Sequence, residues 1–208
     1  MTVQKLMNLK GQRALITGAI GSLGGVMAET LAELGADLIL VDRPGADFSS
    51  LKKLLENNWG IKVWSYHCDL EQNDQRLELI DLVQNDHDIL NILINNAAFV
   101  GVSDLQGWGT SFEDQTVETW RRALEVNLTA PFHLCQGLVT LLKNSTGANI
   151  INIGSIYGEY GPDWRLYDGT SMANPAAYGA SKGGLIQFTR WLSTTLAPGI
   201  RVNAISPG

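Results

Sequence analysis

The sequence has few cysteines, few histidines and no long apolar run, and each shortage excludes a class of protein. Its two cysteines, Cys68 and Cys135, are too few for a disulfide framework and fit core thiols in a reducing compartment. The 3 histidines are scattered without metal-ligand spacing. No segment approaches the roughly 20 apolar residues of a membrane span, and residues 1–12 lack a signal peptide's apolar core. We therefore expect a cytoplasmic protein with no metal site and no membrane contact.

Positive charge is also scarce. The sequence has 15 lysines and arginines against 21 aspartates and glutamates, a formal net charge of −6, and it contains no basic run. This balance argues against a nucleic-acid partner. An apolar fraction of 45% and a charged fraction of 17% are ordinary for a globular protein. Because no linker or internal repeat interrupts the chain, residues 1–208 are predicted to form a single domain.

Glycine is abundant, with 22 residues, and its first cluster follows a short apolar run. The run Arg13–Thr17 stops at Gly18 and leads into GAIGSLGGVMAETLAELGA, whose apolar residues have helical spacing. Strand, glycine turn and helix in this order are typical of a dinucleotide-binding unit. The glycines permit close backbone approach, and the helix N-terminus offers amide groups to a pyrophosphate.

An acidic residue closes the next predicted strand, 37–41. Asp42 stands about as far beyond the glycines as a carboxylate that binds the adenosine ribose hydroxyls. Its charge would repel a 2′-phosphate, which favours NAD over NADP, whereas the neighbouring Arg43 could meet such a phosphate. The alternative is that Asp42 is only a turn residue at a strand end. NAD is therefore the expected cofactor, and NADP is left open.

Strand-like and helix-like segments alternate along the rest of the chain. We expect helices at 48–58, from Asp69 or Leu70 onward, at 116–144 and at 175–196, and strands at 62–66, 89–94, 150–154 and 200–205. Residues 99–114 are expected to form a loop. Regular alternation predicts an α/β fold with one doubly wound parallel sheet and helices on both faces.

Polar residues follow several of these segments. Asp69 follows the strand at 62–66, and it either bonds an adenine amino group or caps the next helix. The small polar run 95–98 (Asn-Asn-Ala-Ala) is suited to lining a cofactor. Asn127 lies within the helix expected at 116–144, where an inward-facing amide requires a polar partner.

The most informative stretch runs from Ser155 to Lys182. Tyr178 and Lys182 have the spacing of side chains on one helix face, a turn apart. An ammonium beside a phenol favours the phenolate, and such a tyrosine can exchange a proton with an alcohol or a carbonyl. Ser155 follows a predicted strand, and open α/β sheets bind ligands at the carboxyl ends of their strands. The alternative is a chance pair on a helix surface.

These landmarks together resemble the short-chain dehydrogenase/reductase family over nearly the whole chain. Residues 17–24 (TGAIGSLG) are similar to its T-G-x-x-x-G-x-G turn and residues 95–98 to its N-N-A-G. Pro207-Gly208 is similar to the P-G after its sixth strand. The resemblance implies a Rossmann-type sheet with strand order 3-2-1-4-5-6 and a nicotinamide cofactor.

The resemblance also implies roles for a catalytic tetrad. Tyr178 would be the general acid/base, Ser155 would steady the substrate oxygen, Lys182 would hold the nicotinamide ribose, and Asn127 would support a proton-relay water. The cofactor contacts expected from all of these motifs are Gly18, Ser22, Leu23, Gly24, Asp42, Arg43, Asp69, Leu70, Asn96, Ala97, Tyr178, Lys182, Pro207 and Gly208.

The chain departs from the family pattern in three places. Ser22 stands where the turn's middle glycine is usual, and Ala98 replaces the last glycine of N-N-A-G. The interval between the tetrad's serine and tyrosine is also longer than is common. The extra loop, 160–173, carries Trp164 and Arg165, which suit a hydroxyl-rich or charged substrate. The alternative is a surface loop with a packed tryptophan.

The run 161–184 is most similar to family members associated with bacterial surface-sugar and flagellin-glycan biosynthesis. We therefore expect an NAD(P)-dependent oxidoreductase that interconverts an alcohol and a carbonyl by hydride transfer, with a sugar derivative as the suggested substrate. Two alternatives stay open. One is a sugar-nucleotide epimerase or dehydratase that retains NAD, and the other is a catalytically silent dinucleotide-binding module.

The resemblance further implies an assembly and a longer chain. We expect a homodimer or homotetramer acting on a small-molecule alcohol or ketone. The sequence stops at Pro207-Gly208, where the family continues with a substrate-covering segment and a seventh strand. We therefore expect the native chain to extend beyond Gly208.

Overall fold

The computed structural model describes residues 7–100, 105–170 and 173–208. Its centre is a parallel six-stranded sheet in the order β3-β2-β1-β4-β5-β6. The strands are β1 (Arg13–Thr17), β2 (Asp37–Asp42), β3 (Val63–His67), β4 (Ile92–Asn95), β5 (Asn149–Ile153) and β6 (Arg201–Ile205). This topology confirms the predicted doubly wound α/β fold, in which the strand order reverses between β1 and β4.

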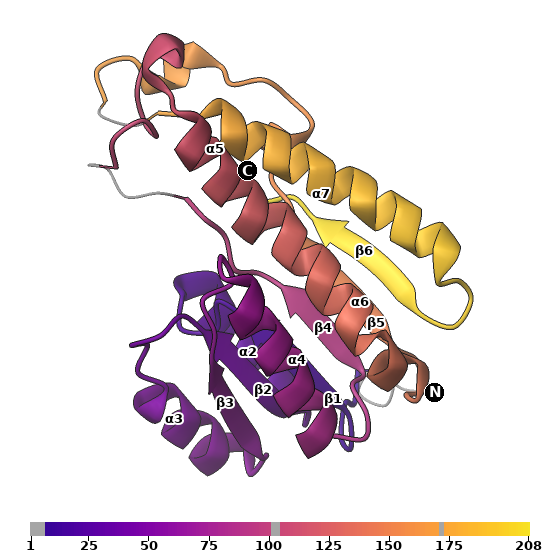
Figure 1. Ribbon diagram of the computed structural model, residues 1–208. Helices are drawn as coiled ribbons and strands as arrows, with labels where there is room; N and C mark the ends of the chain where they lie inside the picture. The colour runs from indigo at the N-terminus through magenta and orange to yellow at the C-terminus, as the bar shows by residue number, and fades with distance from the viewer. Residues whose placement is uncertain (1–6, 101–104, 171–172) are drawn as a thin grey trace.

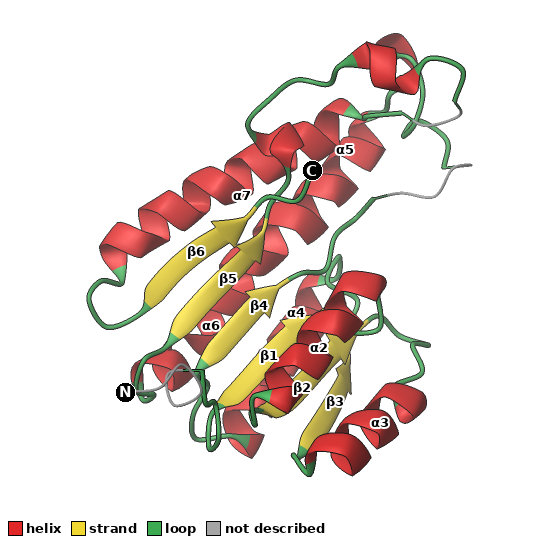
Figure 2. Cartoon of the chain, turned by 180° about the vertical axis from the view of Figure 1, so that it is seen from behind, coloured by secondary structure: helices red, strands yellow, loops and turns green. Residues whose placement is uncertain are grey.

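Helices cover both faces of the sheet. The helices α2 (Ser22–Glu33) and α3 (Ser49–Trp59) lie on one face, toward the viewer in Figure 2. The other face carries α4 (Asn73–Asp86), α6 (Ala130–Lys143) and α7 (Ala176–Thr195), toward the viewer in Figure 1. The helix α5 (Val117–Leu124) runs into the line of α6 and packs against α7. None of the described helices is long and apolar enough to cross a membrane.

Each face of the sheet has its own apolar core because successive strand residues point to opposite sides. In β1, Ala14 and Ile16 pack in the cluster that contains Leu55 of α3. Leu15 packs in the other cluster, which contains Leu134 of α6. The strands β1 and β4 are buried almost throughout, which explains why their sequences are unbroken apolar runs.

The helix expected from Asp69 or Leu70 begins later, so that prediction is wrong. The helix α4 begins at Asn73, with Gln72 as its N-cap residue. Asp69 instead turns its side chain onto its own loop, where Oδ1 accepts a hydrogen bond from the N–H of Glu71 at 3.0 Å. A short carboxylate satisfies a loop backbone as readily as a helix end. Asp69 is therefore not the cap of α4.

The single long helix expected at 116–144 is interrupted. A π-helical turn, η2 (Glu125–Thr129), separates α5 from α6. Turns of this kind are rare and are frequently found at functional sites. Asn127 lies in this turn with its side chain fully buried. Three short 3₁₀ segments complete the description: η1 (Phe112–Asp114), inside the expected loop at 99–114, η3 (Ile156–Gly158) and η4 (Trp164–Tyr167).

Candidate active site

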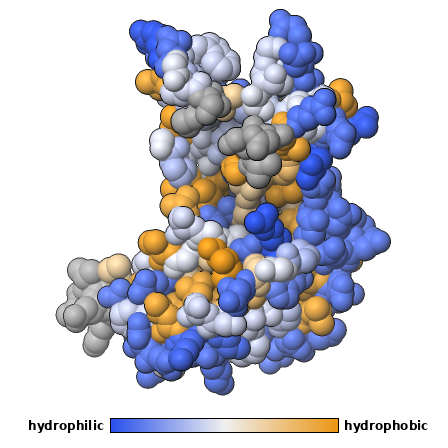
Figure 3. Space-filling model, turned by 90° about the vertical axis from the view of Figure 1, so that its left-hand side faces the viewer, coloured by the Kyte–Doolittle hydropathy of each residue, from blue (hydrophilic) through white to orange (hydrophobic). Residues whose placement is uncertain are grey.

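The carboxyl ends of the strands meet at one edge of the sheet. Thr17, Asp42, Asn95 and Ile153 end their strands there. Figure 3, seen from the side toward which the strands point, shows a hollow lined by apolar residues between the lower body and the loops above it. Parallel α/β sheets bind their ligands at this edge.

Two positions of the glycine turn accept only glycine. Gly18 has φ +65°, and a Cβ there would lie 2.9 Å from Cα of Ala97. A Cβ at Gly24 would overlap the carbonyl oxygen of Gly18 and lie 2.8 Å from Cα of Ala19. The turn thus packs backbone to backbone against the segment after β4. Ser22, in place of a further glycine, is the exposed first residue of α2, where a side chain has room.

Thr17 and Asn96 fix the turn to the end of β4. The Nδ2 of Asn96 donates to the carbonyl oxygens of Thr17 at 2.9 Å and of Gly18 at 3.1 Å. The Oγ1 of Thr17 accepts from the N–H groups of Asn96 and Ala97, each at 3.1 Å. Sequence reasoning gave Thr17 no role of its own, although its place as the first residue of the T-G motif was an available signal.

Asp42 is held against the same turn. Its Oδ2 accepts from the N–H of Ile20 at 2.9 Å, and its Oδ1 accepts from the N–H of Arg43 at 2.8 Å. The carboxylate therefore stands beside the start of α2, while the side chain of Arg43 is exposed. A ribose attached to a pyrophosphate at α2 would be within reach of this carboxylate.

The N-terminus of α2 suits an anionic ligand. Its N-cap residue, Gly21, supplies no side-chain hydrogen bond, and its first turn carries no acidic residue. The first amide groups of the helix are thus available, and the helix dipole adds partial positive charge. Ser22 and Leu23 are exposed. These amide donors fit a pyrophosphate, and the carboxylate of Asp42 fits as an acceptor for the ribose hydroxyls of NAD(P).

Asp69 and Leu70 form part of a well-fixed loop after β3. The N–H of Asp69 donates to Oε1 of Gln75 at 2.7 Å. Leu70 is buried in the core beneath α4 and α6. At the far end of the sheet, the carbonyl oxygen of Pro207 accepts from the N–H of Ile156 at 3.2 Å, so Pro207 and the exposed Gly208 lie beside η3.

Ser155 and Tyr178 have hydroxyl groups that the protein itself hardly uses. Ser155 follows β5, and its Oγ accepts from the N–H of Tyr157 at 3.2 Å, which leaves the hydroxyl proton free to be donated. The phenolic oxygen of Tyr178 has no hydrogen-bond partner among the described residues. Both groups are therefore available to a substrate oxygen.

Lys182 lies one helical turn after Tyr178 and is 2% exposed. Its Nζ donates to the carbonyl oxygen of Ile153 at 2.7 Å and lies 5.8 Å from the centroid of the Tyr178 ring. Burial lowers the pKa of Lys182 to about 8, because desolvation disfavours the charged form. At neutral pH the amine is still mostly protonated, so a positive charge stands between the end of β5 and the tyrosine.

Asn127 connects the π-helical turn to the segment after β4. Its Oδ1 accepts from the N–H of Phe99 at 2.6 Å. Its Nδ2 donates to the carbonyl oxygen of Phe99 at 3.2 Å and to Oγ of Ser181 at 3.0 Å. The prediction that an inward-facing Asn127 has polar partners is confirmed. Ser181 was not assigned a role from the sequence, although it immediately precedes Lys182.

The segment η3 and helix α7 touch through their backbones. A Cβ at Gly158 would lie 2.7 Å from the carbonyl carbon of Lys182, and a Cβ at Gly183 would lie 3.1 Å from the carbonyl oxygen of Gly158. No side chain separates the two elements at this contact. The position of Ser155, the N-cap residue of η3, is thus fixed relative to α7 by main-chain contact.

A cavity of about 600 Å³ opens beside the N-terminus of α7. Its walls come from the segments 110–115, 157–164 and 173–179, so the long loop 160–173 builds part of it. Ser155 and Tyr178 do not line the cavity, but their neighbours Tyr157 and Gly179 do. The aromatic side chains in its wall are Phe112, Tyr157, Tyr160 and Trp164.

The two residues of this loop that were expected to bind substrate lie differently. Trp164 lines the cavity, and its ring packs at 5.7 Å from the ring of Tyr167. Arg165 does not line the cavity: 86% of its side chain is exposed, and its Nη2 lies 2.6 Å from Oδ2 of Asp163. Within the loop, the charge of Arg165 is thus paired with that of Asp163.

Known proteins are similar to this chain in sequence. A family model described as short chain dehydrogenase matches residues 12–208. A 3-oxoacyl-[acyl-carrier-protein] reductase of Aquifex aeolicus is 27% identical over 203 residues, which are 97% of this chain and 75% of that protein.

Solved structures are similar in fold and carry related cofactors. The structure of NAD⁺-bound xylitol dehydrogenase matches with a TM-score of 0.81 and 31% identity, over 96% of this chain and 71% of that one. The RhlG/NADP complex of Pseudomonas aeruginosa matches with a TM-score of 0.82 and 29% identity, over 97% of this chain and 74% of that one. The chain therefore belongs to the short-chain dehydrogenase family and is an oxidoreductase that uses NAD or NADP.

Proposed function

We propose that the protein interconverts an alcohol and a carbonyl by hydride transfer, with Tyr178 as the general acid/base. The observation that carries this proposal is a phenol without a partner among the described residues, one helical turn from a buried lysine ammonium. NAD(P), when bound, supplies the hydride acceptor or donor. The chain's own residues then have to bind the substrate oxygen and move one proton.

In the oxidising direction, the O–H proton of the alcohol passes to the phenolate oxygen of Tyr178; in the reducing direction, the phenol returns it to the carbonyl oxygen. Ser155 donates its hydroxyl proton to the same substrate oxygen, since its Oγ is otherwise only an acceptor. Lys182 supplies the charge that stabilises the phenolate, and its ammonium is also assigned to the nicotinamide ribose.

Asn127 acts through the backbone around it. Its side-chain amide is already engaged by Phe99 and Ser181. We therefore assign the proton-relay water to the main chain of the π-helical turn, which this amide holds in place.

The remaining cofactor contacts follow the shape of the sheet edge. We assign the pyrophosphate to the turn 18–24, the adenosine ribose to Asp42, and the adenine to the loop with Asp69 and Leu70. The nicotinamide is assigned to the space between Ala97 and Pro207-Gly208, within one domain. Because Asp42 is a fixed negative charge beside the turn, NAD is the proposed cofactor in preference to NADP.

We further propose a sugar derivative as the substrate. The cavity beside α7 combines flat aromatic faces with the amides of Gln115 and Asn174 and suits a ligand with apolar ring faces and hydroxyl edges. One structural relative is named for the polyol xylitol. The resemblance of residues 161–184 to proteins of bacterial surface-sugar and flagellin-glycan biosynthesis points in the same direction.

The proposed setting is the cytoplasm, and the proposed assembly is a homodimer or homotetramer. Cys68 and Cys135 are free and buried, in keeping with a reducing compartment. Large aromatic side chains, Trp120, Phe132 and Trp191, are exposed on α5, α6 and α7, as is common for surfaces that associate. Sedimentation velocity would measure the assembly, and a monomer at every concentration would contradict it.

The direct test is the oxidation of NADH, followed by its fluorescence, against matched keto-sugars and simple ketones. We expect keto-sugars to be reduced with the higher kcat/KM. Trp164→Ala should raise the KM for the keto-sugar by about tenfold, the scale of one lost binding contact, and leave the NADH Kd unchanged. Trp59→Ala, at an exposed tryptophan outside the cavity, is the control. Equal kcat/KM values for both substrate classes would contradict the sugar proposal and leave the oxidoreductase assignment intact.

A further inference from the structure

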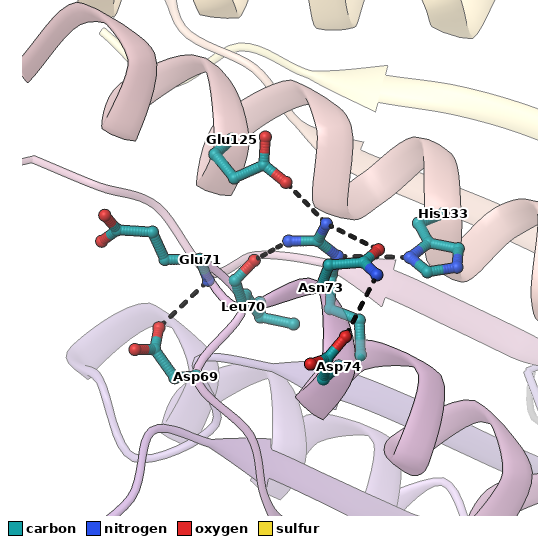
Figure 4. Close-up of polar contacts among 8 residues, drawn as sticks. Asp69, Leu70, Glu71, Asn73, Asp74, Glu125 and His133 are labelled. Atoms are coloured by element: carbon teal, nitrogen blue, oxygen red, sulfur yellow. Dashed lines mark hydrogen bonds and ion pairs between the residues drawn. The ribbon is translucent and has the colours of Figure 1, made fainter. Parts of the chain in front are cut away.

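A buried arginine joins several elements on the adenine side of the proposed site. Arg76 of α4 is 2% exposed. Its guanidinium donates to the carbonyl oxygen of Leu70, pairs with the carboxylate of Glu125 and donates to Nδ1 of His133 at 3.2 Å. Figure 4 shows Glu125, His133, Asn73 and the Leu70 carbonyl converging on this one group. Since a buried charge must be paired and hydrogen-bonded, the arginine holds these partners at fixed relative positions.

A second ion pair also joins the region after β3 to the α5–α6 region, but here the arginine and the glutamate have exchanged sides. The Nε of Arg122, on α5, lies 2.8 Å from Oε1 of Glu71, in the loop after β3. The first pair thus runs from an arginine on α4 to a glutamate in the π-helical turn. The second runs from an arginine on α5 back to a glutamate in the loop. Because the two ion pairs have their charges placed in opposite order, only one relative position of the loop and the turn satisfies both.

The second pair leads directly to proposed site residues at both ends. The guanidinium of Arg122 stands over the ring of Phe99 at 4.9 Å, a cation–π contact. Phe99 is the residue whose backbone N–H and carbonyl are held by Asn127. At the other end, the N–H of Glu71 donates to Oδ1 of Asp69. A continuous series of contacts therefore connects Asp69 with Asn127.

We propose that Arg76 and Arg122 are positioning residues that couple the adenine loop, residues 68–72, to the π-helical turn that carries Asn127. Neither arginine is assigned to the reacting atoms. The coupling rests on the proposed placement of the adenine at Asp69 and Leu70. Binding of an adenine nucleotide then stabilises the loop, the crossed ion pairs and, through them, the turn.

Hydrogen–deuterium exchange of the protein with and without AMP tests this coupling. AMP is the probe because it carries the adenine and its ribose but has no nicotinamide half. In the unmodified protein, saturating AMP should slow exchange in residues 68–72 and also in residues 125–129. The second effect should be about fivefold, the lower end of typical coupling factors.

The variants separate coupling from a general loss of stability. In Arg122→Gln and in Glu125→Gln, both at partly exposed side chains, AMP should still slow 68–72 but no longer slow 125–129. The charge-exchanged double variant Glu71→Arg/Arg122→Glu should restore the effect on 125–129. Lys52→Gln removes an exposed ion pair on α3 and should behave like the unmodified protein.

Two results would overturn the coupling. One is that AMP slows 68–72 but leaves 125–129 unchanged in the unmodified protein. The other is that both single variants retain the full effect. If AMP leaves 68–72 itself unchanged, the adenine placement is wrong and the coupling fails with it.

Discussion

The two ends of the proposed site are built in opposite ways. At the glycine turn, the polar groups of Thr17, Asn96 and Asp42 are bonded within the protein. At the other end, the hydroxyl protons of Ser155 and Tyr178 have no acceptor among the described residues. The first end is shaped before any ligand arrives, whereas the second has hydroxyl groups available for the substrate oxygen of the proposed reaction. Binding energy is most useful to catalysis when it is realised in the transition state.

The largest expected effect is on the unpaired hydroxyl. Tyr178→Phe should lower kcat by about two to four orders of magnitude and leave the free energy of unfolding unchanged, because no protein hydrogen bond is lost. Tyr66→Phe is the converse variant, since the Tyr66 hydroxyl donates to Asp86 at 2.7 Å. It should lower stability by about 1 kcal/mol and leave kcat unchanged. Steady-state kinetics with urea unfolding measures both, and a Tyr178→Phe variant of normal kcat would remove Tyr178 from the mechanism.

At the glycine turn, the expected effect is on stability. Gly24→Ala should destabilise the protein by about 1–3 kcal/mol, because its Cβ would overlap the carbonyl oxygen of Gly18. It should also weaken NADH binding. Gly25→Ala is the matched control, since a Cβ there meets only the carbonyl oxygen of Ala19, at 3.9 Å. Equal unfolding midpoints for the two variants would show that the turn is not packed as described.

The buried charge of Lys182 should lower the stability of the protein at neutral pH, although the proposed mechanism requires it. Its pKa is lowered from 10.5 to about 8 by burial, so below pH 8 both the folded and unfolded states are protonated and the full penalty is present. Between pH 8 and 10.5 only the unfolded state stays protonated, so stability rises with pH. The penalty at neutral pH is about 3 kcal/mol. It is partly offset by the hydrogen bond to Ile153.

Lys182→Met should therefore be more stable than the unmodified protein at pH 7, lose the rise in stability between pH 8 and 10.5, and have little activity. Urea unfolding at several pH values measures this. An unmodified protein whose stability is flat over that range would contradict the buried-charge account.

The smallest expected effect is on the choice of cofactor. Asp42→Asn keeps an oxygen that can accept from the N–H of Ile20 but removes the negative charge. We expect the affinity for NADP relative to NAD to rise about tenfold, roughly 1.4 kcal/mol, while only the exposed hydrogen bond from the N–H of Arg43 is lost. Fluorescence titration of both reduced cofactors measures the ratio. A preference for NADP in the unmodified protein would show that Arg43 dominates at this position.

The strands could be predicted because short apolar runs bounded by glycine, aspartate or asparagine have few other interpretations. Their order followed from the resemblance to the short-chain dehydrogenase/reductase family. The inward position of Asn127 could also be predicted, since a mid-helix asparagine needs a reason. The π-helical turn around it could not, because one inserted residue hardly disturbs a 3.6-residue pattern. The late start of α4 was missed for a related reason: a carboxylate that bonds its own loop has the same sequence signature as a helix cap.

The candidate site was harder to complete from the sequence than the fold. The spacing of Tyr178 and Lys182 indicated two side chains on one helix face, and the resemblance to the family gave this pair its proposed role. Arg76 could not be recognised, because an arginine in an amphipathic helix is expected to face water, and only the positions of Leu70, Glu125 and His133 in space explain its burial. Side chains that act through neighbours distant in sequence have no local signature.

The backbone contact between Gly158 and Gly183 holds η3 against α7 without help from the loop 160–173, so this loop can change independently. Residues 160–173 leave the catalytic framework just after one glycine and return shortly before the other, so their length and composition can change while Ser155 and α7 stay in register. Under the proposed mechanism, selection can therefore alter the substrate-binding loop without rebuilding the groups assigned to proton transfer. The same joint offers an engineer two fixed attachment points for grafting a loop of different specificity.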